Sequence, residues 1–316
     1  MTIEKIPKDT GGKVQTQDLE IIIKSLLDVV SYQPPDRTPN DSTEALEKDV
    51  GSIVESWNAD PSGENRAVFD SISKKAVSVV EFFYSQHTFE TKLVFAMYAW
   101  FFFYIDDNAG KPFLEDFQRR IMLGYPQEDP PLQNLHQVLG NLYNHWDPIS
   151  ANSMVSAAQE FISGTALEVR KEVSEMKIQP TASSWAKYLR AKSGMAPGFS
   201  CAAFPKQTHP DLSAYIQVLP DIDDYLCLVN DILSFYKEEL AGETMTYVHM
   251  RCKTTGKHAA QVLMEMVEEV GDLHGRISAT LEGHSEASKA WDVLENGFIA
   301  WHLSIKRYKL VELGFH

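Results

Sequence analysis

Apolar residues recur at intervals of three and four along most of this chain, which is the spacing of one face of an α-helix. The pattern is clearest in four windows, at residues 67–84, 154–173, 259–281 and 287–313. Segments rich in proline, glycine and polar residues interrupt the helical pattern, at residues 33–39, 59–63, 124–126, 129–131 and 206–210. Strict alternation of apolar and polar residues, which would indicate strands, is scarce. The pattern therefore predicts an all-α protein.

The sequence favours one long helical domain over several short ones. Hydrophobic residues make up 44% of the 316 residues, which is enough for a large core. No internal repeat, low-complexity block or linker divides the middle of the sequence. Length alone is only a weak guide to the number of domains. We therefore expect residues 1–316 to form a single domain, in which the polar residues 1–12 are disordered.

A polar stripe within this apolar pattern suggests a metal site. Asn230, Ser234 and Glu238 follow one another at intervals of four, directly after the apolar residues 225–229. Residues four apart are neighbours on one helical face, and Lys237 falls on the same stripe. Amide, hydroxyl and carboxylate oxygens are the ligands that a hard divalent cation such as Mg²⁺ takes. Alternatively, the stripe is a solvated face on which Lys237 pairs with a nearby acid.

A second acidic site follows the most apolar segment of the chain. Residues 93–105 carry no charge and are too few to span a bilayer, so they predict a buried helix. Asp106 and Asp107 come next, where carboxylates oppose the helix dipole unless a cation compensates them. Aromatic residues share the face of Asp106 and would form a wall beside it: Phe95, Phe102 and Phe103. Alternatively, the two aspartates are solvated before the turn that follows.

Taken together, the two motifs predict opposing metal-binding walls around an apolar cavity. The pairing of Phe-Tyr-Ile-Asp-Asp at residues 103–107 with Asn-Asp-Ile-Leu-Ser-Phe-Tyr-Lys-Glu at residues 230–238 resembles class I terpene synthases. The nearest resemblance is to the trichodiene synthase group of fungal sesquiterpene cyclases, and it extends over nearly the whole chain. It implies a helical bundle around a central apolar cavity. It also implies three magnesium ions and a set of metal ligands, namely Asp106, Asp107, Asn230, Ser234 and Glu238.

The resemblance assigns further roles to four cationic or polar positions. Arg190 matches the arginine that senses the diphosphate, and Gly194 lies at the helix break that relays substrate binding. Arg307 and Tyr308 match a C-terminal pair that donates hydrogen bonds to the diphosphate. Lys237 would add another donor. Without the resemblance, an isolated arginine is by default a surface residue.

The sequence departs from the family pattern at one position. The aspartate-rich motif usually carries another acid at its fifth position, and Gly110 stands there instead. We therefore expect Asp106 to be the principal ligand, with a lesser role for Asp107. Asn108 could supply a weaker oxygen ligand.

Charge and cysteine content exclude several other classes of protein. A formal net charge of −15 argues against a general nucleic-acid binder, which needs a positive field. The segment 253–257 lacks the order and spacing of a phosphate-binding P-loop. Three cysteines fit neither a zinc site nor a disulfide framework, so we expect reduced thiols. No apolar leader stands at the N-terminus and no membrane span is expected, which favours a cytosolic protein.

The expected activity is the ionisation and cyclisation of farnesyl diphosphate with release of inorganic diphosphate. Magnesium would stabilise charge on the leaving group, and aromatic faces would stabilise the carbocation, with Phe95, Phe102, Phe103 and Trp301 as candidates. One alternative is a prenyl chain-elongating transferase, although that class has two Asp-Asp-x-x-Asp motifs. Another is a non-catalytic helical binding protein, which the loss of an acid at Gly110 suggests. The resemblance further implies a homodimer, whereas the product, its stereochemistry, any water addition and the substrate length stay open.

Overall fold

The computed structural model describes residues 14–36, 41–60 and 62–315. The predicted disorder of residues 1–12 therefore lies outside the described residues. Within the described ranges the secondary structure consists of α-helices and short 3₁₀ turns, without strands, which confirms the prediction of an all-α protein. None of the helices in this part of the chain combines the length and the hydrophobicity that a membrane crossing requires.

The first half of the chain forms helices that alternate with short connections. These are α1 (Thr16–Val29), α2 (Asp41–Ser56), α3 (Arg66–Phe83), α4 (Phe89–Asp107), α5 (Pro112–Leu123), η1 (Pro131–Asn134), α6 (Leu135–His145) and α7 (Pro148–Val169). The second half continues in the same way, with α8 (Lys171–Ser174), α9 (Trp185–Ser193), α10 (Ala196–Ala202), η2 (Leu212–Ala214), α11 (Leu219–Ala241), α12 (Tyr247–Thr255), α13 (Ala259–Thr280), α14 (Ser285–Ser304), η3 (Lys306–Tyr308) and η4 (Leu310–Leu313).

Two of the predicted helical windows are shorter than the apolar pattern suggests. The window at residues 154–173 breaks at Arg170, whose extended backbone ends α7 and starts the separate short helix α8. The window at residues 287–313 breaks at Ile305, which is also extended, and the chain then folds back as η3 and η4. This second break brings η3 against α11. Apolar spacing persists through both breaks, so it gives no sign of them.

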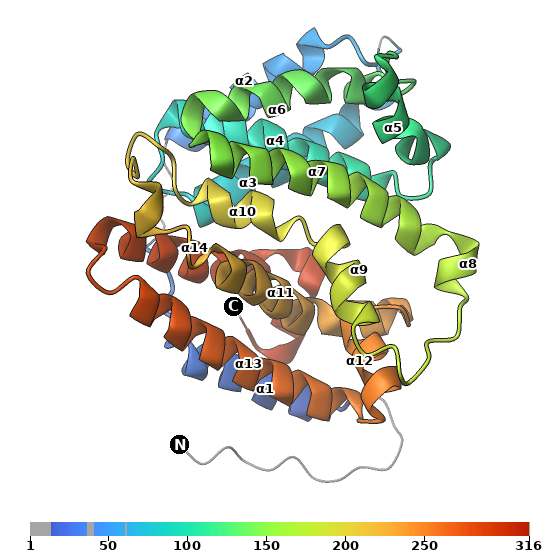
Figure 1. Cartoon of the computed structure of the whole chain (residues 1–316), viewed down its shortest axis with the longest axis vertical. Helices are drawn as coiled ribbons and strands as arrows, with labels where there is room; N and C mark the ends of the chain where they lie inside the picture. The colour runs from blue at the N-terminus through green and yellow to red at the C-terminus, as the bar shows by residue number, and fades with distance from the viewer. Residues whose placement is uncertain (1–13, 37–40, 61, 316) are drawn as a thin grey trace.

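Helix α11 lies at the centre of the helical layers. It packs against α10, α13 and α14, while α1 runs alongside α13 and also contacts α11 (Figure 1). On the opposite side of α10, α7 crosses the molecule and α4 runs beneath it (Figure 1). Most buried apolar side chains belong to one large cluster that includes residues of all these helices. This arrangement is what a single domain would show, although that organisation stays a prediction.

Helix α4 is buried on nearly every face, as its charge-free segment at residues 93–105 predicts. The backbone N–H of Thr91 donates to the hydroxyl of Thr88, which caps the N-terminus. Trp100 and Phe101 are almost fully buried, and Trp57 contacts both of their rings. The helix ends at Asp107, and three residues later Gly110 adopts a left-handed φ of +83°. A side chain is strained in that conformation, which gives a physical reason for glycine at the position where an acid was expected.

Helices α3 and α14 approach one another so closely that their backbones touch. A Cβ atom on Gly297 would overlap the carbonyl oxygen of Phe82. The contact is possible only because glycine has no side chain. Phe83 and Phe298, which follow these two residues, therefore pack ring against ring at 5.0 Å between centroids.

A buried acid ties α10 to α11. The Ser200 hydroxyl donates to Asp223 Oδ1 at 2.5 Å, and Ser200 is fully buried. Burial raises the pKa of Asp223 from its ordinary 3.8 to about 7. The ionised carboxylate is therefore less favourable in the folded protein than in the unfolded chain.

We expect this acid to make the protein less stable as the pH rises. Between about pH 4 and pH 7 the folded state holds a proton on Asp223 that the unfolded state has lost, so the free energy of unfolding falls across this window. Asp223→Asn keeps an oxygen acceptor for Ser200 and removes the titration. Urea unfolding at pH 5 and pH 8 should show that the free energy of unfolding of the wild type falls relative to that of the variant by up to about 3 kcal/mol, at about 1.4 kcal/mol per pH unit between pH 5 and the folded pKa of about 7. An equal pH dependence in both proteins would contradict the assignment.

Candidate active site

One cavity of about 690 Å³ opens between α3, α4, α7, α9, α10, α11 and α14. This volume lies within the usual range for small-molecule pockets. Aromatic side chains supplied by several helices line its apolar part, namely Phe83, Phe102, Phe103, Phe161, Phe199, Phe298 and Trp301. Phe102 stacks on Phe161 at 4.7 Å between centroids and meets Phe199 edge-on at 5.5 Å. The rings therefore support one another as a continuous wall.

The polar part of the same cavity is rich in charge. Five carboxylates line it, on Asp106, Glu168, Asp231, Glu238 and Glu243. Three cationic side chains also line it, on Arg190, Lys237 and Arg307. Burial raises the pKa of both Glu168 and Glu243, and repulsion from Asp106 adds to the effect in each. The carboxylates thus outnumber the cationic side chains, and neighbouring carboxylates oppose one another's ionisation.

The predicted stripe on α11 faces this cavity. Asn230, Ser234 and Glu238 all line it, and Ser234 is only 1% exposed. The Ser234 hydroxyl donates to Glu238 Oε1 at 2.6 Å, and Lys237 Nζ donates to the same oxygen at 3.0 Å. The stripe is therefore a connected polar surface in the interior, which disagrees with the alternative of a solvated helix face.

Asp106 lines the cavity from the end of α4, whereas Asp107 does not. Asp106 Oδ2 lies 3.5 Å from Arg307 Nη2, and both side chains are nearly half exposed. Asp107 instead lies 3.7 Å from Lys75 Nζ and is absent from the lining. The amide of Asn108 donates to the carbonyl of Tyr104, so it caps α4. The lesser role expected for Asp107 agrees with this placement.

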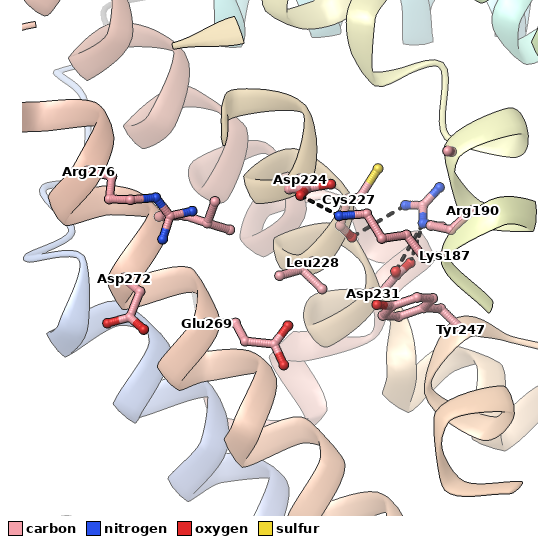
Figure 2. Close-up of a pocket in the computed structure, with 12 residues that line it drawn as sticks. Lys187, Arg190, Asp224, Cys227, Leu228, Asp231, Tyr247, Glu269, Asp272 and Arg276 are labelled. Atoms are coloured by element: carbon pink, nitrogen blue, oxygen red, sulfur yellow. Dashed lines mark hydrogen bonds and ion pairs between the residues drawn. The ribbon is translucent and has the colours of Figure 1, made fainter. Parts of the chain in front are cut away.

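Arg190 reaches from α9 to α11 and binds two neighbouring residues there. Its Nε lies 2.9 Å from an Asp231 carboxylate oxygen, and its Nη2 donates to Asn230 Oδ1 at 3.0 Å. Figure 2 shows this arginine beside a smaller polar cleft of about 230 Å³, which Arg190 and Asp231 also line. The ion pair is therefore part of the wall between the cleft and the cavity. Burial raises the pKa of Asp231 to about 6, although Arg190 opposes this shift.

Gly194 follows Arg190 at the C-terminus of α9. A Cβ atom there would lie 2.8 Å from Arg190 Nη1 and 2.9 Å from Cys227 Sγ. The next residue, Met195, adopts a left-handed φ of +52°, which is strained for a residue with a side chain. The break between α9 and α10 is therefore held in one tight conformation directly beside the arginine.

Arg307 and Tyr308 lie in η3, the turn that folds back against α11. Tyr308 is 6% exposed, and Lys237 Nζ lies 6.0 Å from the centre of its ring. Burial raises the pKa of the Tyr308 hydroxyl, so it stays protonated at neutral pH. The structure thus brings Lys237, Arg307 and Tyr308 to the same end of the cavity as the polar stripe.

The aromatic prediction is wrong for Phe95. Phe102, Phe103 and Trp301 line the cavity, but Phe95 is fully buried behind Phe199, at 5.7 Å between ring centroids. The reason is that α4 is enclosed on nearly all sides, so a residue on the same broad face can point into the core behind the cavity. Further lining residues were not predicted from the sequence, namely Phe83, Phe161, Phe199, Phe298, His302, Glu168 and Glu243. For α14 a signal existed, because Phe298, Trp301 and His302 share one helical face.

The oxygen donors at this end of the cavity suit a hard cation. Three oxygen-bearing side chains of α11 and the carboxylate of Asp106 line one space, and the Ser234 and Glu238 oxygens already lie 2.6 Å apart. In the described ranges, no three His, Cys, Asp or Glu side chains are grouped so that they could hold a metal by themselves. A cation here would therefore need the neutral oxygens of Asn230 and Ser234. Such an all-oxygen set fits Mg²⁺.

The chain has the fold of the class I terpene synthases. The superposition on the solved structure of a linalool/nerolidol synthase from Streptomyces clavuligerus includes 86% of this chain and 98% of the synthase, with a TM-score of 0.63. The sequence identity is 11%, so the likeness is one of fold alone.

The chain belongs to the trichodiene synthase (TRI5) family, whose model matches residues 20–314. Terpene synthase BipA from Cochliobolus sativus is 35% identical over 231 residues, which are 72% of this chain and 71% of that relative. Monoterpene synthase 25 from Postia placenta is 28% identical over 295 residues, which are 92% of this chain and 86% of that relative. The resemblance to trichodiene synthase-like terpene synthases is confirmed.

We predict that Gly194→Ala displaces Arg190 from Asp231. The added Cβ would lie within 3 Å of Arg190 Nη1 and Cys227 Sγ, so the guanidinium must shift from its position beside Asp231, and we expect the buried ion pair to separate. Separating such a pair costs about 3–5 kcal/mol when no relaxation occurs, and we expect a loss of at least about 2 kcal/mol in urea unfolding. Gly140→Ala is the matched control, because nothing lies within 4 Å of that Cβ. Equal stability of the two variants would contradict the prediction.

Proposed function

We propose that this protein catalyses the magnesium-dependent ionisation and cyclisation of farnesyl diphosphate, with release of inorganic diphosphate. The observation that carries the proposal is a single cavity with two unlike ends. One end has aromatic walls, and the other combines Asp106 with the oxygen stripe of Asn230, Ser234 and Glu238. An isoprenyl diphosphate has the same two parts, an apolar chain and a charged head.

The polar end would bind the diphosphate only with cations present. Its five carboxylates exceed its three cationic side chains, so the protein groups alone repel an anion. Asp106, Asn230, Ser234 and Glu238, with a lesser contribution from Asp107, would hold Mg²⁺ ions, three by analogy with the family. When bound, Mg²⁺ supplies Lewis-acid stabilisation of the charge that develops on the leaving diphosphate.

Cationic and hydroxyl side chains would also donate hydrogen bonds to the leaving diphosphate. Arg190, Lys237 and Arg307 each line the cavity, and each now pairs with a carboxylate. A diphosphate would offer these donors stronger acceptors than the carboxylates do. Tyr308 remains protonated and can donate a further hydrogen bond. The proposed role of these side chains is to bind and orient the leaving group.

The aromatic end would protect and shape the hydrocarbon. A carbocation reacts with water, so the cavity must exclude water while it stabilises positive charge. The faces of Phe102, Phe103 and Trp301, together with those of Phe83 and Phe199, can do both. Their arrangement would select the conformation in which the chain of the substrate cyclises.

An activity assay with isoprenyl diphosphates of different chain lengths tests the proposal. Purified protein with Mg²⁺ should release diphosphate from farnesyl diphosphate faster than from geranyl or geranylgeranyl diphosphate, and mass spectrometry should detect a cyclic C15 product. A chelator should stop the reaction. A preference for geranyl diphosphate, which the name of Monoterpene synthase 25 makes a specific alternative, would change the substrate but keep the chemistry. Binding without release would favour the non-catalytic alternative, and a lengthened diphosphate product would favour a prenyltransferase.

We also predict that the two walls of the cavity contribute separately to turnover. Asp106→Asn and Asn230→Ala should each lower kcat/KM by about 100-fold or more, as loss of an electrostatic stabiliser does, while helical content stays near that of the wild type. Asp107→Asn is the matched comparison, since Asp107 contacts Lys75 outside the lining. It should lose clearly less activity than Asp106→Asn. Normal activity of either main variant would contradict its assignment as a ligand.

The homodimer and the cytosolic location stay predictions. The first rests on the family resemblance, and sedimentation at micromolar concentration would decide it.

A further inference from the structure

His302 of α14 lines the same cavity and contacts the polar stripe of α11 at Asn230. It lies on α14, is 1% exposed, and has one ring nitrogen, Nε2, 3.1 Å from Asn230 Nδ2. Its other ring nitrogen, Nδ1, lies 2.8 Å from the carbonyl oxygen of Phe298. The rings of Phe298, Trp301 and Tyr308 surround it, at 4.5 to 5.1 Å between centroids. Neither the sequence motifs nor the proposed function gives this histidine a role.

The Phe298 carbonyl fixes the tautomer of His302. A carbonyl oxygen only accepts hydrogen bonds, so Nδ1 must carry the proton and donate it. In a neutral imidazole the other nitrogen, Nε2, then has a lone pair and accepts. Its partner must be a donor. The Asn230 amide therefore presents its NH₂ group to α14.

Arg190 independently requires the same orientation of Asn230. A guanidinium group only donates, so the atom that faces Arg190 Nη2 at 3.0 Å must be the amide oxygen, Oδ1. The two ends of the asparagine amide have nearly the same shape and differ mainly in hydrogen bonding. His302 on one side and Arg190 on the other thus distinguish its oxygen from its nitrogen.

We propose that His302 is a positioning residue that keeps the Asn230 amide oxygen turned away from α14 and toward Arg190. The inference deepens the proposed function, because only the oxygen of an asparagine can bind a cation. A flipped amide would present its NH₂ group to the arginine and to any cation. Loss of a residue that hydrogen-bonds to a metal ligand commonly lowers the affinity for the metal by about 10–100-fold. The Arg190 contact alone cannot secure the orientation if this arginine turns to the diphosphate, whereas the Phe298 carbonyl holds the His302 ring on α14.

The tautomer can be measured without any ligand. Long-range ¹H–¹⁵N NMR on protein labelled in histidine, with the His302 signals assigned by their loss in His302→Gln, should show a neutral ring protonated at Nδ1. A ring protonated at Nε2 would overturn the proposal, because Asn230 would then have to present its oxygen to α14. This result does not depend on whether the protein is a terpene synthase.

Variants test the consequence for cation binding. Calorimetry with Mg²⁺ and inorganic diphosphate should show that His302→Phe, which keeps a ring but has no acceptor, binds at least about tenfold more weakly than the wild type. His302→Gln keeps an oxygen acceptor and should recover much of the affinity. His87→Phe is the control, since His87 also bonds to a backbone carbonyl, that of Ala202, but lies outside the cavity lining. It should bind within about twofold of the wild type.

The outcomes separate the two proposals. If His302→Phe is folded and binds as the wild type does, or if His302→Gln recovers nothing, the positioning role is wrong. If His302→Phe does not fold, the NMR result and His302→Gln decide the question. If the wild type shows no magnesium-dependent binding of diphosphate, the proposed function fails, and the orientation of Asn230 is judged from NMR alone.

Discussion

The structure depends on one constraint, which is that α11 must carry polar side chains through the middle of an apolar core. A buried polar atom without a partner costs more free energy than its hydrogen bond returns when made. Asn230, Asp231 and Ser234 on the central part of α11 therefore have partners on another element or on the next helical turn. Arg190 of α9 meets Asp231 and Asn230, His302 of α14 meets Asn230, and Ser234 meets Glu238. The position of the neighbouring helices follows from these contacts as much as from apolar packing.

The sequence predicted the fold class and the two walls of the cavity because both are periodic features. Three- and four-residue spacing indicates helices, and the spacing of Asn230, Ser234 and Glu238 places their oxygens on one face before any neighbour is known. Phe95 shows the limit of predicting cavity residues from periodicity, because it lies on the predicted face but does not line the cavity. Periodicity gives the direction of a side chain around its own helix, but not whether the space in front of it is a cavity or another ring. The breaks at Arg170 and Ile305 were missed for a similar reason, because apolar spacing continues across them.

Contacts between segments that are distant in the chain could not be predicted from the sequence. The order of residues does not show that His302 forms a hydrogen bond with Asn230, 72 positions earlier, or that Glu168 and Asp106 line the same cavity. These contacts arise only when α7, α11 and α14 are packed together. They also explain why a protein with a strongly negative net charge can be proposed to bind an anion. The acids gather at one end of a single cavity, where they would hold the cations that reverse the local field.

The touching backbones of Gly297 and Phe82 bear on how such a protein can diversify. Because main-chain atoms set the separation of α3 and α14, the frame beside Phe83 and Phe298 does not depend on the size of those two rings. An exchange of one of these side chains therefore changes the packing of the wall but leaves the backbone contact that fixes the distance between α3 and α14. Phe83 and Phe298 are therefore positions at which substitutions would change the shape of the cavity and, with it, the course of the proposed cyclisation.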